Sequence, residues 1–483
     1  MNDGSLPPAL PTDAVLLPLS EGKLLVSPSH ATFCRVPSKH VPLLRGLLAG
    51  DPRNAPLPDS LVEQLRLHGW FEPPRPTVPA TPNIHLQLTN ACNLDCVYCC
   101  TDSGMPRRTE LTFEQWLAVA DEAHDCLGPG ARFALLGGEP LLQPFALDVA
   151  QHLRERQVQL TLFTNGVLLS EPSLASRVAA LVRTGMQVRV SLAGVTRETC
   201  DQLSGAPRFD AALAGVQAVA DHGAEVVVDI MLVPTAVEEI ANQVGQLRRR
   251  LPPRTKLSFG LLFQGGRESG DHLFESRLEL EAALDRIAFE AGEVIPGEIR
   301  SPLAKRREAC TCALGHHLNV RSDGRLFSCF RMEEQVGDLQ QERFRAALER
   351  LRARPRPARV LPFCRDCALV TLCGGACRSE NLLLTGDPER PLCGPWRIRV
   401  LSELLAEDRV AALEWPSPQL ASEARRRGFD APDHVVPVRL STNVADSGVG
   451  DAPGSHGAVS TADHRLRLPV PPEVIRSDGC RRR

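Results

Sequence analysis

The sequence predicts an α/β fold built on a parallel sheet, with a small module before it and a cysteine-rich region after it. Two observations lead to this prediction. Between residues 83 and 300, six short β-type runs alternate with longer amphipathic helical stretches, as in parallel strands joined by crossover helices. From about residue 301 the alternation stops, and eight cysteines lie between positions 310 and 393. Six repeats favour a partial (β/α)6 barrel, although periodicity alone also allows an open doubly wound sheet.

Length and composition narrow the class of protein. The 483 residues suffice for about three domains, and a hydrophobic content of 43% suffices for their cores. The net charge of −3 means that no overall positive field attracts the chain to nucleic acid or to anionic lipid. No apolar run approaches the roughly 20 residues of a membrane span, and no secretory signal is evident. In such a chain, 16 cysteines indicate metal or redox chemistry in the cytoplasm rather than disulfides.

The first 75 residues predict a small unit behind a flexible start. Residues 1–13 are rich in proline and are expected to be flexible. Within 14–75, the order of strands and then helices indicates a winged-helix-like module, whose charge balance does not favour DNA binding. The expected strands are Ala14–Leu19, Lys23–Val26 and Thr32–Val36, and the expected helices are Ser38–Leu48, with Ser38 as N-cap, and Leu57–Trp70. The proline-rich stretch Pro73–Pro82 follows as a linker.

The repeated unit of 83–300 supplies the predicted sheet. Its strands are expected at Ile84–Leu88, Phe133–Leu136, Gln159–Phe163, Gln187–Ser191, Glu225–Val233 and Lys256–Phe263. Helices are expected between them, among them Thr112–Leu127, Phe145–Arg156, Pro172–Thr184 and Phe209–His222. The carboxyl ends of parallel strands form the edge at which such sheets bind their ligands.

Two further segments complete the chain. Residues 301–413 form the cysteine-rich domain, which closes with a helix expected at Pro395–Leu413. Residues 414–483 mix Pro, Gly, Ser and Arg with few aromatic residues, a composition typical of a disordered tail.

The first cysteine cluster lies directly after the first strand of the sheet. Cys92, Cys96 and Cys99 stand on one short loop in a CxxxCxxC spacing. Three thiolates can ligate three irons of a cubane cluster and leave the fourth iron open to another molecule. A structural zinc site is the alternative, but such a site needs four ligands, usually in two pairs, and no partner pair of cysteines lies nearby in the sequence. The adjacent Cys100 is interpreted as a bystander.

These residues resemble the radical SAM enzymes, whose signature is this spacing with an aromatic residue before the last cysteine, as Tyr98 is here. The resemblance implies a [4Fe–4S] cluster on the three cysteines, with S-adenosylmethionine chelated to the open iron. It also implies reductive cleavage of the sulfonium to a 5′-deoxyadenosyl radical, which takes a hydrogen atom from the substrate.

Further motifs extend the resemblance along the sheet. Gly137-Gly138-Glu139-Pro140 after the second strand matches the family's GGEP, which meets the methionine amino group. Asn165 ends the third strand and Ser191 the fourth, as cofactor contacts do in the family. Ser204 stands where relatives carry an arginine for the cofactor carboxylate, and Arg208 is the candidate substitute. Arg267, in a Gly-Gly-Arg turn, reads equally well as a loop cation or as a functional residue.

The second cysteine series resembles the SPASM extension of that family. Seven or eight thiols suffice for two auxiliary [4Fe–4S] clusters, and a zinc ribbon is the alternative. By position, the resemblance assigns the outer cluster to Cys364, Cys367, Cys373 and Cys393, and the inner one to Cys312, Cys329 and Cys377. Cys310 either completes the inner cluster or leaves it an open iron. His316 and His317 beside this series are candidate proton acceptors or ordinary loop residues.

The combined resemblance predicts an enzyme that oxidatively modifies, and cross-links, a ribosomally made precursor peptide or protein. The N-terminal module is a candidate for binding the leader of such a peptide by strand addition. A flavodoxin, ferredoxin or other reductase is expected as electron donor. The alternatives are an anaerobic sulfatase-type maturase, a small-molecule radical SAM dehydrogenase, and a non-catalytic iron–sulfur or zinc scaffold that binds peptides.

Overall fold

The computed structural model describes the N-terminal module, the parallel sheet and part of the cysteine-rich region. The described residues are 10–18, 23–27, 29–30, 32–50, 57–73, 83–262, 265–274, 283–284, 286–287, 317–330, 332–353, 358, 361, 364–365, 367 and 370–391. The predictions for Cys310, Cys312, His316, Cys393, the helix 395–413 and the tail 414–483 lie outside them.

The N-terminal module has the predicted order of three strands and two helices. Strands β1 (Val15–Pro18), β2 (Lys23–Ser27) and β3 (Thr32–Val36) form an antiparallel meander, followed by helices α1 (Val41–Leu48) and α2 (Asp59–Leu67). Leu44, Leu65 and Trp70 are buried in a core of its own. The predicted N-cap was wrong: Ser38 begins a 3-10 turn and makes no side-chain cap, because Pro37 already provides the extended residue before the turn.

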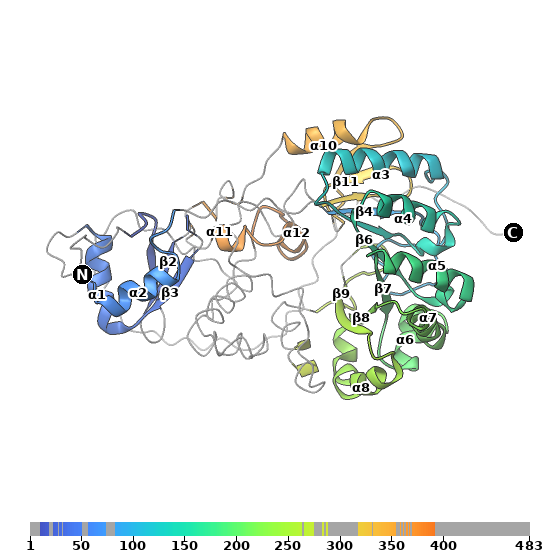
Figure 1. Ribbon diagram of the computed structural model, residues 1–483, viewed down its shortest axis with the longest axis horizontal. Helices are drawn as coiled ribbons and strands as arrows, with labels where there is room; N and C mark the ends of the chain where they lie inside the picture. Colours follow the sequence, from blue (N-terminus) through green and yellow to red (C-terminus); the bar gives the residue numbers. More distant parts are fainter. Residues whose placement is uncertain are drawn as a thin grey trace, which may run out of the picture. The chain divides into compact units, whose positions relative to one another are not determined.

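The central sheet confirms the predicted parallel strands, each within two residues of its expected start and end (Figure 1). The strands are β4 (Asn83–Gln87), β5 (Arg132–Leu136), β6 (Gln159–Thr164), β7 (Gln187–Leu192), β8 (Val226–Leu232) and β9 (Lys256–Leu261), paired in that order. The crossover helices are α3 (Phe113–Leu127), α4 (Ala146–Glu155), α5 (Pro172–Arg183), α6 (Arg197–Ser204), α7 (Phe209–Asp221) and α8 (Val237–Arg250).

The helices cover one face of this sheet, so the two faces differ in chemistry. Alternate strand residues enter a common core with the helices, among them Ile84, Leu135, Leu162, Val190 and Val228. The residues between them point to the opposite, inner face, which is the more polar one. That inner face includes Arg189 and Asp229, joined by hydrogen bonds of 2.7 and 2.5 Å.

Three strands that follow residue 316 extend the same sheet beyond β4. Strand β10 (His317–Val320) pairs parallel to β4, and β11 (Arg325–Phe327) and β12 (Gln335–Asp338) continue antiparallel. Helix α10 (Phe344–Arg352) then contributes Phe344, Ala347 and Leu348 to the core of the sheet. The sequence pattern does not indicate this continuation, because the strands are only three or four residues long.

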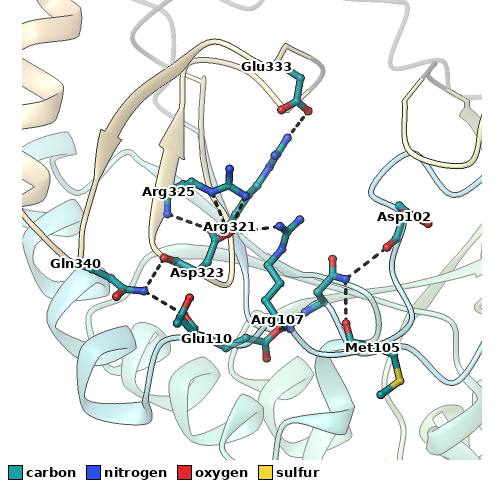
Figure 2. A network of polar contacts seen from close by, with 11 residues as sticks. Asp102, Met105, Arg107, Glu110, Arg321, Asp323, Arg325, Glu333 and Gln340 are labelled. Atoms are coloured by element: carbon teal, nitrogen blue, oxygen red, sulfur yellow. Dashed lines mark hydrogen bonds and ion pairs between the residues drawn. The ribbon is translucent and has the colours of Figure 1, made fainter. Parts of the chain in front are cut away.

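A polar network joins the β10–β11 turn to the segment that follows the cysteine loop (Figure 2). The Asp323 carboxylate accepts a hydrogen bond of 2.9 Å from Arg325 and lies 3.4 Å from the Arg107 guanidinium. Gln340 donates to the carbonyls of Thr109 and Asp323 at 3.0 and 2.9 Å. The network therefore links two segments that lie more than 200 residues apart in the chain.

The remaining described part of the cysteine-rich region contains two short helices, α11 (Val370–Cys373) and α12 (Arg378–Thr385). Among the residues that the structure describes, no helix is long and apolar enough to cross a membrane.

Candidate functional site

The cysteine loop leaves the carboxyl end of β4 and carries three partly exposed thiols. Cys92, Cys96 and Cys99 lie on it, and its closing residues turn back so that the Cys92 amide donates to the Gly104 carbonyl at 2.9 Å. The Cys99 sulfur accepts a hydrogen bond of 3.3 Å from the Ser103 amide and lies 3.4 Å from the Thr101 hydroxyl. Both contacts hold the Cys99 sulfur against the closing residues of the loop.

Burial opposes ionisation of the other two thiols. It raises the pKa of Cys92 to about 11, and it raises the pKa of Cys96 despite the nearby Arg208 guanidinium. Negative charge on the buried Glu139, on Cys96 or on Cys99 adds to the rise in the pKa of Cys92. Within the described ranges, no three Cys, His, Asp or Glu side chains converge at the spacing of a single metal ion. Cysteine thiolates are the donors that a [4Fe–4S] cluster takes from a protein, so the chemistry of the loop fits the expected cluster.

The Gly137–Gly138 turn after β5 packs directly on the start of the cysteine loop. A Cβ atom on Gly137 would lie 2.4 Å from the Thr89 carbonyl oxygen, and one on Gly138 would lie 2.2 Å from that of Ala91. The Gly138 and Glu139 amides donate to these carbonyls at 2.8 Å. The close approach that requires glycine is therefore to the chain's own backbone, three residues or fewer before Cys92.

Glu139 is fully buried and connects the ends of β5 and β6. Its carboxylate accepts hydrogen bonds from the Thr164 hydroxyl at 2.8 Å, the Asn165 amide at 2.7 Å and the Leu141 amide at 3.0 Å. Burial raises the pKa of Glu139, and these donors oppose the rise. Pro140 is also buried and begins the 3-10 turn that follows.

Arg208 is buried at the carboxyl ends of β6 and β7. Its Nη1 donates to the Asn165 carbonyl at 3.0 Å and its Nη2 to the Ser191 carbonyl at 2.8 Å. Only 2% of Arg208 is exposed, and its Nε has no hydrogen-bond partner among the described residues. The Asn165 side chain in turn accepts a hydrogen bond from the Val167 amide and donates one to the Asn93 side chain inside the cysteine loop. The structure thus brings Arg208, Asn165, Ser191 and the cysteine loop together.

Residues 86–244 match the family described as the radical SAM superfamily. They are a radical SAM domain. Relatives extend the likeness over most of the chain. The chain is 24% identical to a PqqA peptide cyclase of Granulibacter bethesdensis, over 74% of this chain and 94% of that protein. It is 26% identical to an AdoMet-dependent heme synthase of Methanosarcina barkeri, over 64% of this chain and 94% of that protein.

A solved structure shows the same fold. The structure described as native anSMEcpe with bound AdoMet superposes with a TM-score of 0.51 at 18% identity, covering 71% of this chain and 99% of that one. The chain is thus an enzyme that contains a radical SAM domain, and the family of that domain implies a [4Fe–4S] cluster and S-adenosylmethionine.

Two residues that brace the cysteine loop, Glu110 and Arg267, were not identified from the sequence as doing so. The Glu110 carboxylate accepts hydrogen bonds from the Thr89 hydroxyl at 2.8 Å and from the Asn90 amide at 2.7 Å, just before the loop. Arg267 donates from Nε to the Cys96 carbonyl at 2.9 Å and from Nη1 to the Ser103 carbonyl at 2.8 Å. Glu110 belongs to no motif that could have indicated its role, and the Gly-Gly-Arg turn leaves the role of Arg267 open.

The glycines beside Arg267 bring its turn against the same loop. A Cβ atom on Gly266 would lie 2.4 Å from the Cys99 carbonyl oxygen, and the Arg267 amide donates to that oxygen at 2.9 Å. Helix α6 meets the loop from another side, because its Leu203 carbonyl accepts the Val97 amide at 3.0 Å. The loop is therefore held from several strands of the sheet.

The described auxiliary cysteines fall into two neighbourhoods and one single position. Cys364 and Cys367 lie in one apolar cluster with Leu361, while Cys373 and Cys377 lie in another with Ala376. Cys329 is buried just after β11. The ligand assignments for these cysteines, and for Cys310, Cys312 and Cys393, stay predictions.

Proposed function

We propose that the enzyme oxidatively modifies, and cross-links, a ribosomally synthesised precursor peptide. The observation that carries the proposal is the likeness to a PqqA peptide cyclase over 94% of that protein, together with the cysteine series behind the domain. The cluster and S-adenosylmethionine, when bound, supply a one-electron chemistry that removes a hydrogen atom from the substrate.

Different residues of the chain would hold the cluster and S-adenosylmethionine. Cys92, Cys96 and Cys99 would ligate the cluster. Arg208 would attract the cofactor carboxylate, because it is a buried cation whose hydrogen bonds to Asn165 and Ser191 go to neutral carbonyls. The Gly137–Pro140 turn and the ends of β6 and β7, at Asn165 and Ser191, would line the remainder of the cofactor site.

Anaerobic turnover tests the proposed reaction. The reduced enzyme, S-adenosylmethionine and a small peptide encoded beside the gene should yield 5′-deoxyadenosine and a peptide lighter by about two hydrogens. A peptide of unchanged mass would contradict the cross-linking proposal. A sulfatase as the modified partner would instead favour the sulfatase-type maturase.

Iron analysis tests the auxiliary clusters separately. Two auxiliary [4Fe–4S] clusters and the domain cluster together require about twelve irons per chain. Replacing Cys92, Cys96 and Cys99 by alanine should leave about eight, and so should replacing Cys364, Cys367, Cys373 and Cys393. Zinc in place of iron, with no cleavage of S-adenosylmethionine, would support the non-catalytic scaffold instead.

A second candidate is a small-molecule radical SAM enzyme. The likeness to an AdoMet-dependent heme synthase favours it, because that relative is as similar as the peptide cyclase. Hydrogen loss from a small molecule in the absence of any peptide would support this candidate.

Two partners follow from the main proposal. A flavodoxin, ferredoxin or other reductase would supply the electron. The N-terminal module would bind the leader of the precursor peptide at an edge of the β1–β2–β3 sheet. Deleting residues 14–75 should then weaken peptide binding while leaving the iron content unchanged.

A further inference from the structure

Two polar side chains lie side by side on the inner face of the sheet, where β10 pairs with β4. Asn319 and His85 are direct partners in the parallel register of these strands. Their neighbours Ile84, Leu86 and Leu318 enter the helix-side core, so Asn319 and His85 face the opposite side.

Both side chains hold buried polar atoms without a hydrogen-bond partner among the described residues. Asn319 is fully buried, and neither its Oδ1 nor its Nδ2 has a partner. The Nδ1 of His85 is buried and also unpaired, whereas its Nε2 lies 3.4 Å from the Asn83 amide nitrogen. Folded proteins pair roughly nine in ten buried polar groups or more, so three unpaired atoms on two directly paired strand residues call for a ligand.

The chemistry of the pair selects a neutral ligand. Burial, reinforced by the nearby His317, lowers the pKa of His85 to about 4, so its imidazole is neutral at physiological pH. An asparagine amide offers one acceptor and a two-proton donor, and a neutral imidazole nitrogen adds one more donor or acceptor. A peptide group presents the complementary N–H and C=O, whereas a carboxylate or phosphate would find no positive charge on either side chain.

We propose that Asn319 and His85 form a binding point for a main-chain peptide group of the substrate. This inference rests on the proposed function, since it requires a peptide substrate. It assigns to the inner face of the sheet a contact that does not depend on the side chains of the peptide. The contact would therefore position a peptide segment regardless of which residue is modified.

Substitution of Asn319 by leucine separates binding from stability. Leucine has about the size of asparagine but no polar atoms. In the substrate-free enzyme, Asn319→Leu therefore removes the unpaired amide without leaving a cavity, and the melting temperature should rise by about 1–3 °C. The same change should weaken binding of the candidate precursor peptide, measured anaerobically by fluorescence anisotropy, by about ten-fold. If Asn319 had a structural role, its substitution would lower the melting temperature instead.

Asn381 provides the matched control. It is also fully buried, but its amide donates to the Gly375 and Pro388 carbonyls at 3.4 and 3.3 Å, so Asn381→Leu should lower the melting temperature. If Asn319→Leu behaves like this control and leaves peptide affinity unchanged, the proposal is overturned in favour of a structural or water-binding role. Asn319→Ala removes the same atoms without added bulk and must weaken binding equally.

The two proposals fail in different ways. A wild-type enzyme that binds no peptide contradicts the proposed function, and this inference with it. A wild-type enzyme that binds and modifies the peptide, with both Asn319 variants at wild-type affinity, contradicts this inference alone.

Discussion

At the scale of single residues, His85 makes folding depend on pH. Its pKa in the folded chain is about 4, against an ordinary value of 6.5, so the unfolded chain binds more protons at this residue between those values. Stability contributed by the neutral ring is therefore complete above pH 6.5 and declines as the pH falls toward 4. A drop from about pH 7 to about pH 5 should cost about 2 kcal/mol of unfolding free energy at this residue.

Denaturant unfolding of wild type and His85→Gln at both pH values measures that difference. Glutamine does not titrate, so the variant should lose less stability on acidification. His317 is the titratable neighbour that adds to the effect, and it is present in both proteins. Equal losses in wild type and variant would contradict the lowered pKa.

Arg208 is a second residue whose replacement has a defined outcome. Arg208→Met would leave the Asn165 and Ser191 carbonyls without their donors, at a cost of about 3 kcal/mol in unfolding free energy. It should also weaken equilibrium binding of S-adenosylmethionine, whereas Arg208→Lys keeps the charge and should lose less of both. Wild-type cofactor affinity in Arg208→Met would exclude the proposed carboxylate contact.

At the scale of elements, the glycine turns decide how closely the strand ends meet the cysteine loop. The Cβ atom of Gly138→Ala would overlap the Ala91 carbonyl oxygen, so the turn must move and the iron content per chain should fall sharply. Gly245 in α8 is the control, since its nearest neighbour would lie 3.9 Å away. Gly245→Ala should gain about 0.5–1 kcal/mol of helix stability and retain all iron.

Arg267 acts on the same loop through hydrogen bonds. Arg267→Met removes donors to the Cys96 and Ser103 carbonyls, and we expect about ten-fold faster loss of iron to a chelator. Arg267→Lys should be intermediate. Arg177→Met, which breaks only an exposed ion pair with Asp148, is the control and should hold iron like wild type. Unchanged iron loss in Arg267→Met would show that the loop holds its shape without this residue.

At the scale of the whole molecule, hydrogen bonds and an ion pair tie the β10–β11 turn to the segment that follows the cysteine loop (Figure 2). Burial raises the pKa of Asp323, but the hydrogen bonds from Arg325 and the charges of Arg325 and Arg107 outweigh burial and lower it. The stability contributed by the carboxylate is therefore present above the ordinary aspartate pKa and is lost as the pH falls through the lowered one. Asp323→Asn should cost at most about 1 kcal/mol, because solvent reaches its partners Arg107 and Arg325, whose side chains are 31% and 36% exposed, and screens both pairs.

Hydrogen exchange locates the effect of that substitution. Both 105–111 and 321–340 should exchange faster in Asp323→Asn, because the network joins them. Glu333→Gln is the control, since the glutamate side chain of the Arg321–Glu333 pair is 80% exposed and its loss should change neither segment. Faster exchange in one segment alone would show that the two are not coupled.

The sequence was informative where structure is local or periodic. The six parallel strands and the place of the cysteine loop directly after β4 follow from alternating apolar runs and from motifs at strand ends. Glu110, the contacts of Arg267 and strand β10 could not be predicted, because each depends on the pairing of distant segments. Arg267, for example, lies 171 residues from Cys96, and no local pattern records that contact.

Strand β10 also limits how a peptide can attach to the enzyme. Because β10 already occupies the free edge of β4, an incoming peptide cannot extend the sheet beside the strand that leads into the cysteine loop. In the part of the chain that the structure describes, the edge strands are β9 and β12 of the large sheet and β1 and β3 of the small one. A substrate held by strand addition must therefore dock away from β4 and reach the reactive centre with a free, unpaired segment.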